Sequence, residues 1–196
     1  MAFTERLRRD FSTVVLVLIP VAIVLNLALG QIVSLLALPL FLDSIGTVLV
    51  AILAGPWAGA LTGLLTNLLG GFISPFFPPF APVAVVIGLV AGFAAQYGWF
   101  RSAWKVVVSG VLIALAAALV ATPIRVLLFG GITGSGASVL IAYLLATGRG
   151  LVESVLAITF LSNVADKVIT ALVAWFIVRR LSRRYVSRFP RAEQVR

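Results

Sequence analysis

The sequence predicts an all-α integral membrane protein with six transmembrane helices and both termini in the cytoplasm. Two observations support the membrane class. The 196 residues are 62% hydrophobic and only 11% charged, and a soluble core of this size does not bury so much apolar side chain. The charges gather at the ends of long apolar runs, as the orientation of membrane helices requires. The loops are short, so we expect a single domain over residues 1–196.

The first apolar run predicts a helix over residues 11–30. The run is longer than the apolar core of a signal peptide, and Glu5 and Asp10 are atypical of the basic region before such a core, so we expect it to remain uncleaved. Asn26 lies within this run. A polar side chain in a membrane helix is expected to face protein rather than lipid.

Residues 42–72 form an apolar stretch that is too long for one span of a hydrocarbon core of roughly 30 Å. Gly55-Pro56 interrupts it, because proline lacks a backbone donor and disfavours helical geometry in the residue before it. We therefore expect a helical hairpin made of residues 41–54 and 56–73.

The rest of the chain predicts three more spans, over residues 83–97, 106–128 and 151–178. Before the first of these, residues 74–82 carry four prolines and three phenylalanines. Such a composition argues against a helix and indicates a stiff aromatic loop at the membrane surface. Residues 137–147 are apolar but too few to span, so we expect a short surface or re-entrant helix there.

The basic residues orient the six spans. With the N-terminus inside, the outer side receives only Arg125 and Arg149. The cytoplasmic side receives twelve basic residues: Arg6, Arg8, Arg9, Arg101, Lys105, Arg179, Arg180, Arg183, Arg184, Arg188, Arg191 and Arg196. A seventh span would move the basic tail outside, against the positive-inside bias. The net charge of +9 therefore indicates membrane topology and not nucleic-acid binding.

Polar side chains near the predicted outer ends of the helices are candidates for substrate binding, because ionisable groups in a membrane are costly unless they are paired or functional. These candidates are Asp43, Asn67, Arg125, Tyr143 and Glu153, and Asn163, deeper in the last predicted helix, is a candidate for the floor of the same pocket. We expect them to form a pocket covered by the aromatic loop and by residues 130–150. In it, Arg125 is suited to bind a carboxylate or phosphate bidentately.

Simpler explanations stay open for several of these residues. Asp43 and Glu153 are suited to cap the helices that begin beside them. Arg125 is long enough to reach the membrane interface or to pair with either acid. Asn67 is equally suited to an interhelical hydrogen bond.

Asp166 and Lys167 lie deeper in the last predicted helix. Neighbouring helical side chains point about 100° apart, so we do not expect an ideal ion pair between these two. We interpret them as residues that connect helices or face a partner protein.

The chain lacks the residues of most catalytic and metal sites. It contains no histidine and no cysteine, which excludes disulfides, thiol catalysis and the usual zinc or haem ligands. It also contains no Walker motif. We therefore expect no enzyme activity, no metal and no cofactor, and another protein must supply the energy for any uphill transport.

The hairpin carries a specific pattern, Leu42-Asp43 followed by Gly55-Pro56-x-x-Gly59-Ala60-Leu61-x-Gly63-x-x-x-Asn67. It resembles the second and third helices of the substrate-binding S components of energy-coupling factor (ECF) vitamin transporters. The resemblance implies a subunit of the plasma (inner) membrane that captures a vitamin, a nucleobase-like compound or a related micronutrient from outside. It also implies ATP-driven import by a transmembrane coupling subunit and two ATPase subunits.

In that family, small residues at four-residue spacing on the first helix form a docking face for the partner subunits. The matching positions here are Ala22, Asn26 and Gly30, and Asn26 departs from the usual small residue. Gly59 and Gly63 form a second small-residue face that lets another helix approach closely. Two other functions remain possible from the residues alone, a membrane ligand sensor and a membrane scaffold or assembly protein.

Overall fold

The structure is a computed structural model that describes residues 10–191. The predicted cytoplasmic residues Arg6, Arg8, Arg9 and Arg196 lie outside this range. Within it the chain is helical and contains no β-strand. The α-helices are α2 (Thr13–Leu35), α3 (Ile45–Ala54), α4 (Pro56–Gly70), α5 (Ala81–Gln96), α6 (Ala103–Phe129), α7 (Gly136–Ala146), α8 (Leu151–Arg180) and α9 (Arg183–Val186). Two short 3-10 helices, η1 (Pro78–Phe80) and η2 (Trp99–Arg101), precede α5 and α6.

Four helical segments of the described chain are long and apolar enough to cross a membrane: Thr13–Leu35, Pro78–Gln96, Ala103–Phe129 and Leu151–Arg180. The hairpin helices are shorter, since α3 has 10 residues and α4 has 15. At 1.5 Å per residue, these are roughly 15 and 22 Å long, less than the roughly 30 Å of a hydrocarbon core. Neither helix of the hairpin therefore has the length of a full span.

The hairpin turns at Gly55-Pro56, as the sequence predicts. Gly55 has a φ of 116°, which glycine adopts without strain, and Pro56 begins α4 at a position where its missing N–H costs no hydrogen bond. All ten residues of α3 are buried, and α3 contacts α2, α4, α5 and α8. The predicted second helix is thus the centre of the bundle.

The aromatic segment of residues 74–82 is more helical than the sequence indicates. Pro78–Phe80 form η1, and α5 begins at Ala81 with Pro82 in its first turn. The expectation that this segment excludes helix was wrong, because the fixed φ of proline suits the first turn of a helix.

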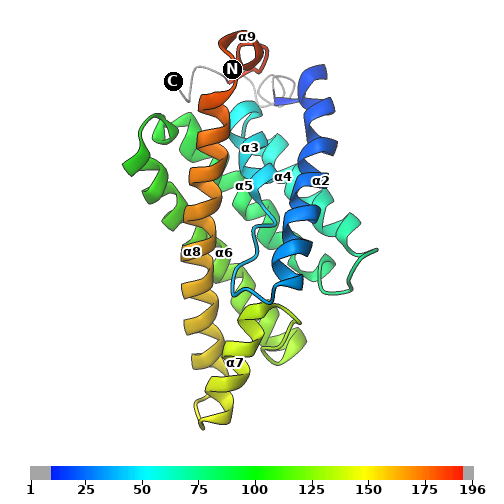
Figure 1. The fold of residues 1–196 in the computed structure, drawn as a ribbon, viewed down its shortest axis with the longest axis vertical. Coiled ribbons are helices and arrows are strands. Elements are labelled where there is room, and N and C mark those ends of the chain that lie inside the picture. The colour runs from blue at the N-terminus through cyan, green and yellow to red at the C-terminus, as the bar shows by residue number, and fades with distance from the viewer. Residues whose placement is uncertain (1–9, 192–196) are drawn as a thin grey trace.

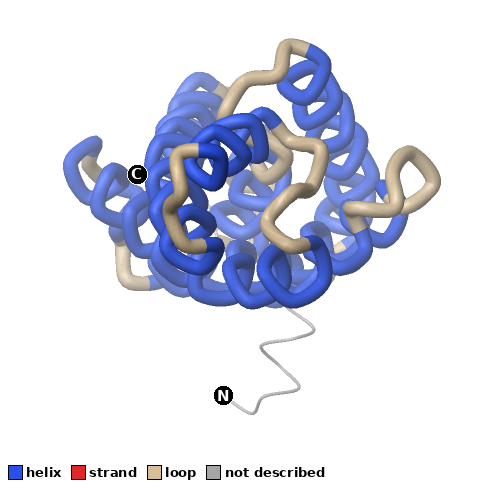
Figure 2. The backbone as a smooth tube through the Cα atoms, turned by 90° about the horizontal axis from the view of Figure 1, so that it is seen from below, coloured by secondary structure: helices blue, strands red, loops and turns tan. Residues whose placement is uncertain are grey.

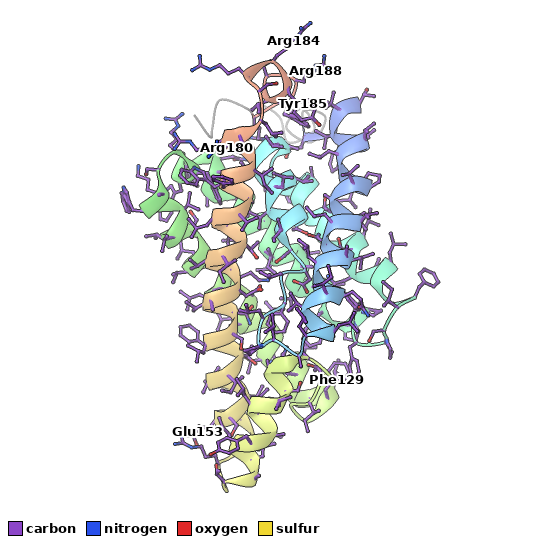
Figure 3. The ribbon with its side chains drawn as sticks, viewed as in Figure 1. Phe129, Glu153, Arg180, Arg184, Tyr185 and Arg188 are labelled. Atoms are coloured by element: carbon purple, nitrogen blue, oxygen red, sulfur yellow. The ribbon has the colours of Figure 1, made fainter. Side chains whose placement is uncertain are left out.

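The two ends of the described chain meet at one end of the bundle, which we call the α9 end (Figure 1). Arg191 donates to the Oδ1 atom of the buried Asp10 from Nη2 at 2.7 Å and from Nε at 3.0 Å. Val186 and Phe189 are buried there as well. The tail is therefore packed onto the bundle, and its labelled arginines, Arg184 and Arg188, lie at this end (Figure 3).

The opposite end, which we call the α7 end, carries α7 and the beginning of α8 (Figure 1). Seen from this end, the helices form a bundle and loop segments lie across their near ends (Figure 2). Arg149 and Glu153 are exposed there and form a salt bridge of 3.0 Å. The exposed basic residues of the tail and this pair thus lie at opposite ends.

The small residues expected to dock partner subunits face the chain's own helices instead. These residues are Ala22, Asn26, Gly30, Gly59 and Gly63. Ala22 and Asn26 are 1% and 0% exposed, and a Cβ atom on Gly59 or Gly63 would collide with α3 or α5, respectively. Small residues permit close helix packing, and here they are used for packing within the chain. Packing within the chain accounts for these small residues, and their docking role stays a prediction.

Candidate functional site

A cavity of about 330 Å³ lies towards the α7 end of the bundle. Its walls come from the end of α2, the segment 36–44, α4, the segment 71–80, α5, α6, the segment 130–135 and α8. The volume is at the small end of the range of roughly 300–1,000 Å³ that small-molecule sites occupy. The lining residues therefore come from segments that are far apart in the sequence.

Four of the six predicted binding residues line this cavity: Asp43, Asn67, Arg125 and Asn163. The other two do not. Tyr143 is 66% exposed on α7, and Glu153 lies near the far tip of the molecule, where it pairs with Arg149 (Figure 3). The predicted convergence thus holds for four residues and fails for Tyr143 and Glu153.

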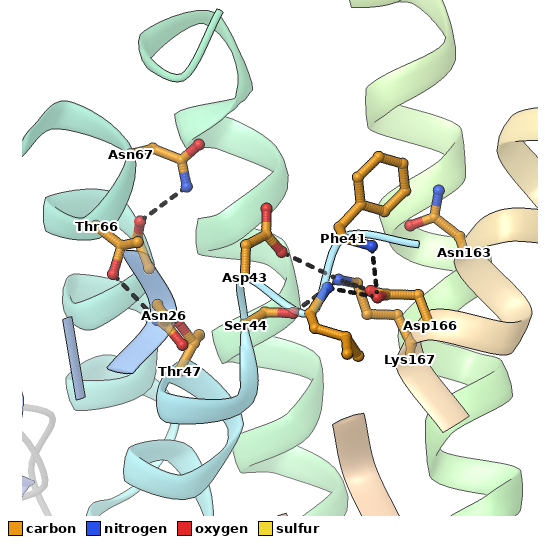
Figure 4. A network of polar contacts seen from close by, with 12 residues as sticks. Asn26, Phe41, Asp43, Ser44, Thr47, Thr66, Asn67, Asn163, Asp166 and Lys167 are labelled. Atoms are coloured by element: carbon orange, nitrogen blue, oxygen red, sulfur yellow. Dashed lines mark hydrogen bonds and ion pairs between the residues drawn. The ribbon is translucent and has the colours of Figure 1, made fainter. Parts of the chain in front are cut away.

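The segment 36–44 is held against α8 by Asp166. The backbone N–H groups of Phe41 and Leu42 donate to Oδ1 of Asp166 at 2.9 and 2.7 Å (Figure 4). Leu42 has a φ of 47°, which is uncommon for a residue with a side chain. The charge-assisted hydrogen bonds to Asp166 offset this strain, and they place Phe41 and Asp43 at the cavity.

Lys167 is buried beside the same carboxylate. Its Nζ atom donates to Oδ2 of Asp166 and to Oγ of Ser44, the latter at 2.7 Å, and lies 3.6 Å from Oδ1 of Asp43 (Figure 4). The expectation that Asp166 and Lys167 would not form an ideal ion pair was wrong, because the flexible lysine side chain reaches back to its neighbour. Their expected role in connecting segments of the bundle is confirmed by the contacts with Phe41, Leu42 and Ser44. Asp43 likewise does not cap α3, whose cap residue is Ser44.

Arg125 lies on α6 and is only 4% exposed, so its side chain is packed inside the bundle. Its guanidinium lies 5.2 Å from the ring centre of Phe41 and 5.6 Å from that of Phe80, within the range of cation–π attraction. Its Nε and Nη1 atoms are buried and have no hydrogen-bond partner. Within residues 10–191, no acidic side chain approaches it closely enough to form a salt bridge.

Aromatic rings form one wall of the cavity. Phe41, Phe76, Phe77 and Phe80 line it, and Phe76 and Phe80 pack against Phe129 at ring-centre distances of 5.3 and 5.9 Å. These contacts connect the aromatic segment to the end of α6. The segment 130–135 follows this end and brings further lining residues to the cavity.

Asn67 and Asn163 add polar groups to the lining. Asn67 donates from its amide to the carbonyl of Gly63 at 3.2 Å, and Asn163 donates to that of Thr159 at 2.8 Å. Each bond stays within one helix, so neither amide connects two helices. Each amide keeps a second N–H and an oxygen for a molecule in the cavity.

Asn26 does connect helices, close to the cavity (Figure 4). Its amide donates to the hydroxyls of Thr47 on α3 and Thr66 on α4, and its oxygen accepts from the backbone N–H of Gly46 at 2.7 Å. Asn26 therefore fixes α2 to the hairpin, which explains why a polar residue stands in the row of small residues. Lys167, which lines the cavity, and Thr47 and Thr66, which bind Asn26, are not among the predicted binding residues.

Comparison with known protein families gives a match over the first part of the chain. The family model for the substrate-specific component of ECF transporters matches residues 12–129, which is more than half of the chain. Neither the comparison with curated proteins nor that with solved structures found a match. The matched residues include α2 to α6 and three of the four predicted binding residues that line the cavity, Asp43, Asn67 and Arg125. The chain therefore belongs to the family of ECF transporter substrate-specific components, which are multi-pass membrane proteins that bind the substrate of a transporter.

Proposed function

We propose that the cavity at the α7 end is the substrate site and that it takes up a small metabolite from the outer face of the plasma membrane. A vitamin, a nucleobase-like compound or a related micronutrient fits the family. The observation that supports this most strongly is the lining itself. Asp43, Asn67, Arg125 and Asn163 meet around an aromatic-walled cavity of about 330 Å³, although they lie on separate segments of the chain.

The orientation follows from the charges. The α9 end carries the exposed arginines of the tail, whereas Arg149 at the α7 end is neutralised by Glu153. The positive-inside rule then favours a cytoplasmic α9 end and an outward-facing cavity. In this proposal the chain passes six times between the two ends of the bundle, α3 and α4 are the two shortest of these passages, and both termini lie inside.

Energy for import comes from partners in this proposal. The sequence has no nucleotide-binding motif, so a transmembrane coupling subunit and two ATPase subunits supply the energy by hydrolysing ATP. The chain itself requires no cofactor. Its contribution is to bind the substrate and release it inside when the complex changes conformation.

Co-expression tests this function. We expect the tagged chain to purify together with an ECF coupling subunit and both ATPase subunits, and to carry a small compound that mass spectrometry identifies. Liposomes that contain the complete complex should accumulate that compound with ATP, and liposomes that contain the chain alone should not. Accumulation by the chain alone, or a failure to assemble with any coupling subunit, would contradict the proposal.

A further inference from the structure

Arg125 differs from the other buried charged residues of the described chain. These are Asp10, Asp166 and Lys167, and each lies in an ion pair, Asp10 with Arg191 and Asp166 with Lys167. Arg125 is buried to the same degree but has no ion pair, and its Nε and Nη1 atoms have no hydrogen-bond partner. A buried charge without a partner is strongly unfavourable unless a bound molecule supplies one.

Arg125 reaches the cavity from one side of the bundle and Lys167 from another. Arg125 lies on α6 and Lys167 on α8, and these two helices run in opposite directions (Figure 1). Both residues line the cavity, and both lie within 6.0 Å of the Phe41 ring centre.

The two cationic groups are not equivalent. Lys167 is already surrounded by Asp166 and Asp43, so these three residues together carry a formal charge of −1 when all are ionised. An anion at Lys167 would meet the Asp43 carboxylate, whose side chain is 32% exposed. Arg125, in contrast, has no acidic side chain of the described chain within ion-pair distance. A bound anion is therefore stabilised at Arg125, and a hydrogen-bond donor is favoured at Asp43.

The surroundings of Arg125 also restrict the shape of the bound molecule. Phe41 and Phe80 lie against the guanidinium, and Phe76 and Phe77 extend the aromatic wall. A planar ring stacks favourably on such side chains. The cavity of about 330 Å³ limits the ring system to a small one.

We infer that the substrate is a small ring-bearing anion, with a carboxylate or phosphate group bound by Arg125 and its ring against the phenylalanine wall. The inference rests on the proposed function of the cavity as the substrate site. It specifies the chemical class of the substrate, which family membership leaves open.

A charge series tests the inference on the purified full-length chain. Nicotinate, nicotinamide and 3-(aminomethyl)pyridine form one set, and indole-3-acetate, indole-3-acetamide and tryptamine form a second. Within each set the ring is kept and the charge changes from negative to neutral to positive. Thermal melting and equilibrium dialysis measure binding. At least one acid should bind about tenfold or more tightly than its amide and its amine, as expected for a charge-assisted hydrogen bond.

Variants then assign the preference to a residue. Arg125→Gln should remove the preference for the acid, and Arg125→Lys should restore only part of it, because an ammonium lacks the planar fork of the guanidinium. Arg149→Gln is the matched control, since Arg149 is exposed and lies outside the cavity. It should bind all six compounds as the unmodified chain does.

Three results would overturn the inference: amides or amines that bind as tightly as the acids, no acid that binds, or a preference for acids that survives in Arg125→Gln. If Arg125→Gln does not fold, the charge series on the unmodified chain decides. Assembly with the coupling subunit is measured on the same preparation. If the chain assembles but prefers neutral or cationic compounds, only the inferred negative charge of the substrate is contradicted. If the chain does not assemble, the proposed function is contradicted.

Discussion

Lys167 is the residue whose replacement tests the polar network at the cavity most severely. Its Nζ atom is buried between Asp166 and Asp43, and Lys167→Met removes their positive partner while keeping a similar side-chain length. Removing one partner of a buried ion pair typically costs about 3–5 kcal/mol, because a buried charge is left uncompensated. For a chain of this size, each kcal/mol lowers the melting temperature by roughly 2–4 °C, so the expected decrease is about 6–20 °C.

A second substitution separates the charge from the other contacts of the network. Asp166→Asn removes the negative charge but keeps an oxygen that accepts from the N–H groups of Phe41 and Leu42. The double variant of Lys167→Met with Asp166→Asn should therefore melt at a higher temperature than Lys167→Met alone. This non-additivity is the signature of a direct interaction.

Lys105→Met is the control, because Lys105 is the other lysine of the chain and lies beside Trp104 at the surface. It should change the melting temperature little. The reasoning is refuted if Lys167→Met melts as Lys105→Met does, or if the two substitutions at residues 166 and 167 simply add. Melting of the detergent-solubilised protein, followed by tryptophan fluorescence, provides the measurement.

Three further predictions concern packing and topology. Gly88→Val should prevent a monodisperse preparation, as judged by size-exclusion chromatography, because its Cβ would collide with the backbone of α4; a stable protein would contradict the close contact. Asn26 connects three helices, so Asn26→Ala should lower the free energy of unfolding by about 1–3 kcal/mol for each buried group that loses its partner. An unchanged melting temperature would refute this role. The chain has no cysteine, and Thr147 and Ser187 are both exposed. Cysteines introduced at these two positions should react with an impermeant maleimide from opposite sides of the membrane, and reaction of both from outside would contradict the proposed orientation.

Features that depend on local chemistry could be predicted from the sequence. The turn at Gly55-Pro56 is fixed by the conformational limits of proline and by the freedom of glycine, and the structure has it. The helical segments α5, α6 and α8 follow from long apolar runs, which need no knowledge of their neighbours. The charged residues at the ends of those runs follow from the same pattern.

Contacts between distant segments could not be predicted. The second predicted helix starts at Ile45 and not at residue 41, because the N–H groups of Phe41 and Leu42 bind Asp166, which lies more than 120 residues further along the chain. No local pattern indicates that contact. The glycines of α4 pose the same problem: their spacing shows that a helix lies close, but not which helix.

The two misplaced site residues have a geometric explanation. The sequence indicates that Glu153 lies near the start of the last helix, but not how far this helix projects. With 30 residues, α8 is roughly 45 Å long, well beyond the roughly 30 Å of a hydrocarbon core. Its first turn and α7 therefore extend past the cavity, and Glu153 and Tyr143 are exposed.

In the proposed function, the cavity at the α7 end holds the transported compound. Ser74 lines this cavity, and Ser74→Cys is nearly isosteric and introduces the only thiol of the chain. The most direct measurement is the rate at which this thiol reacts with a small maleimide, with and without the compound identified by mass spectrometry. Ser187→Cys, at the α9 end, is the matched control. A saturating concentration of the compound should slow the reaction at residue 74 and leave the reaction at residue 187 unchanged. Equal rates at residue 74 with and without bound compound would contradict it.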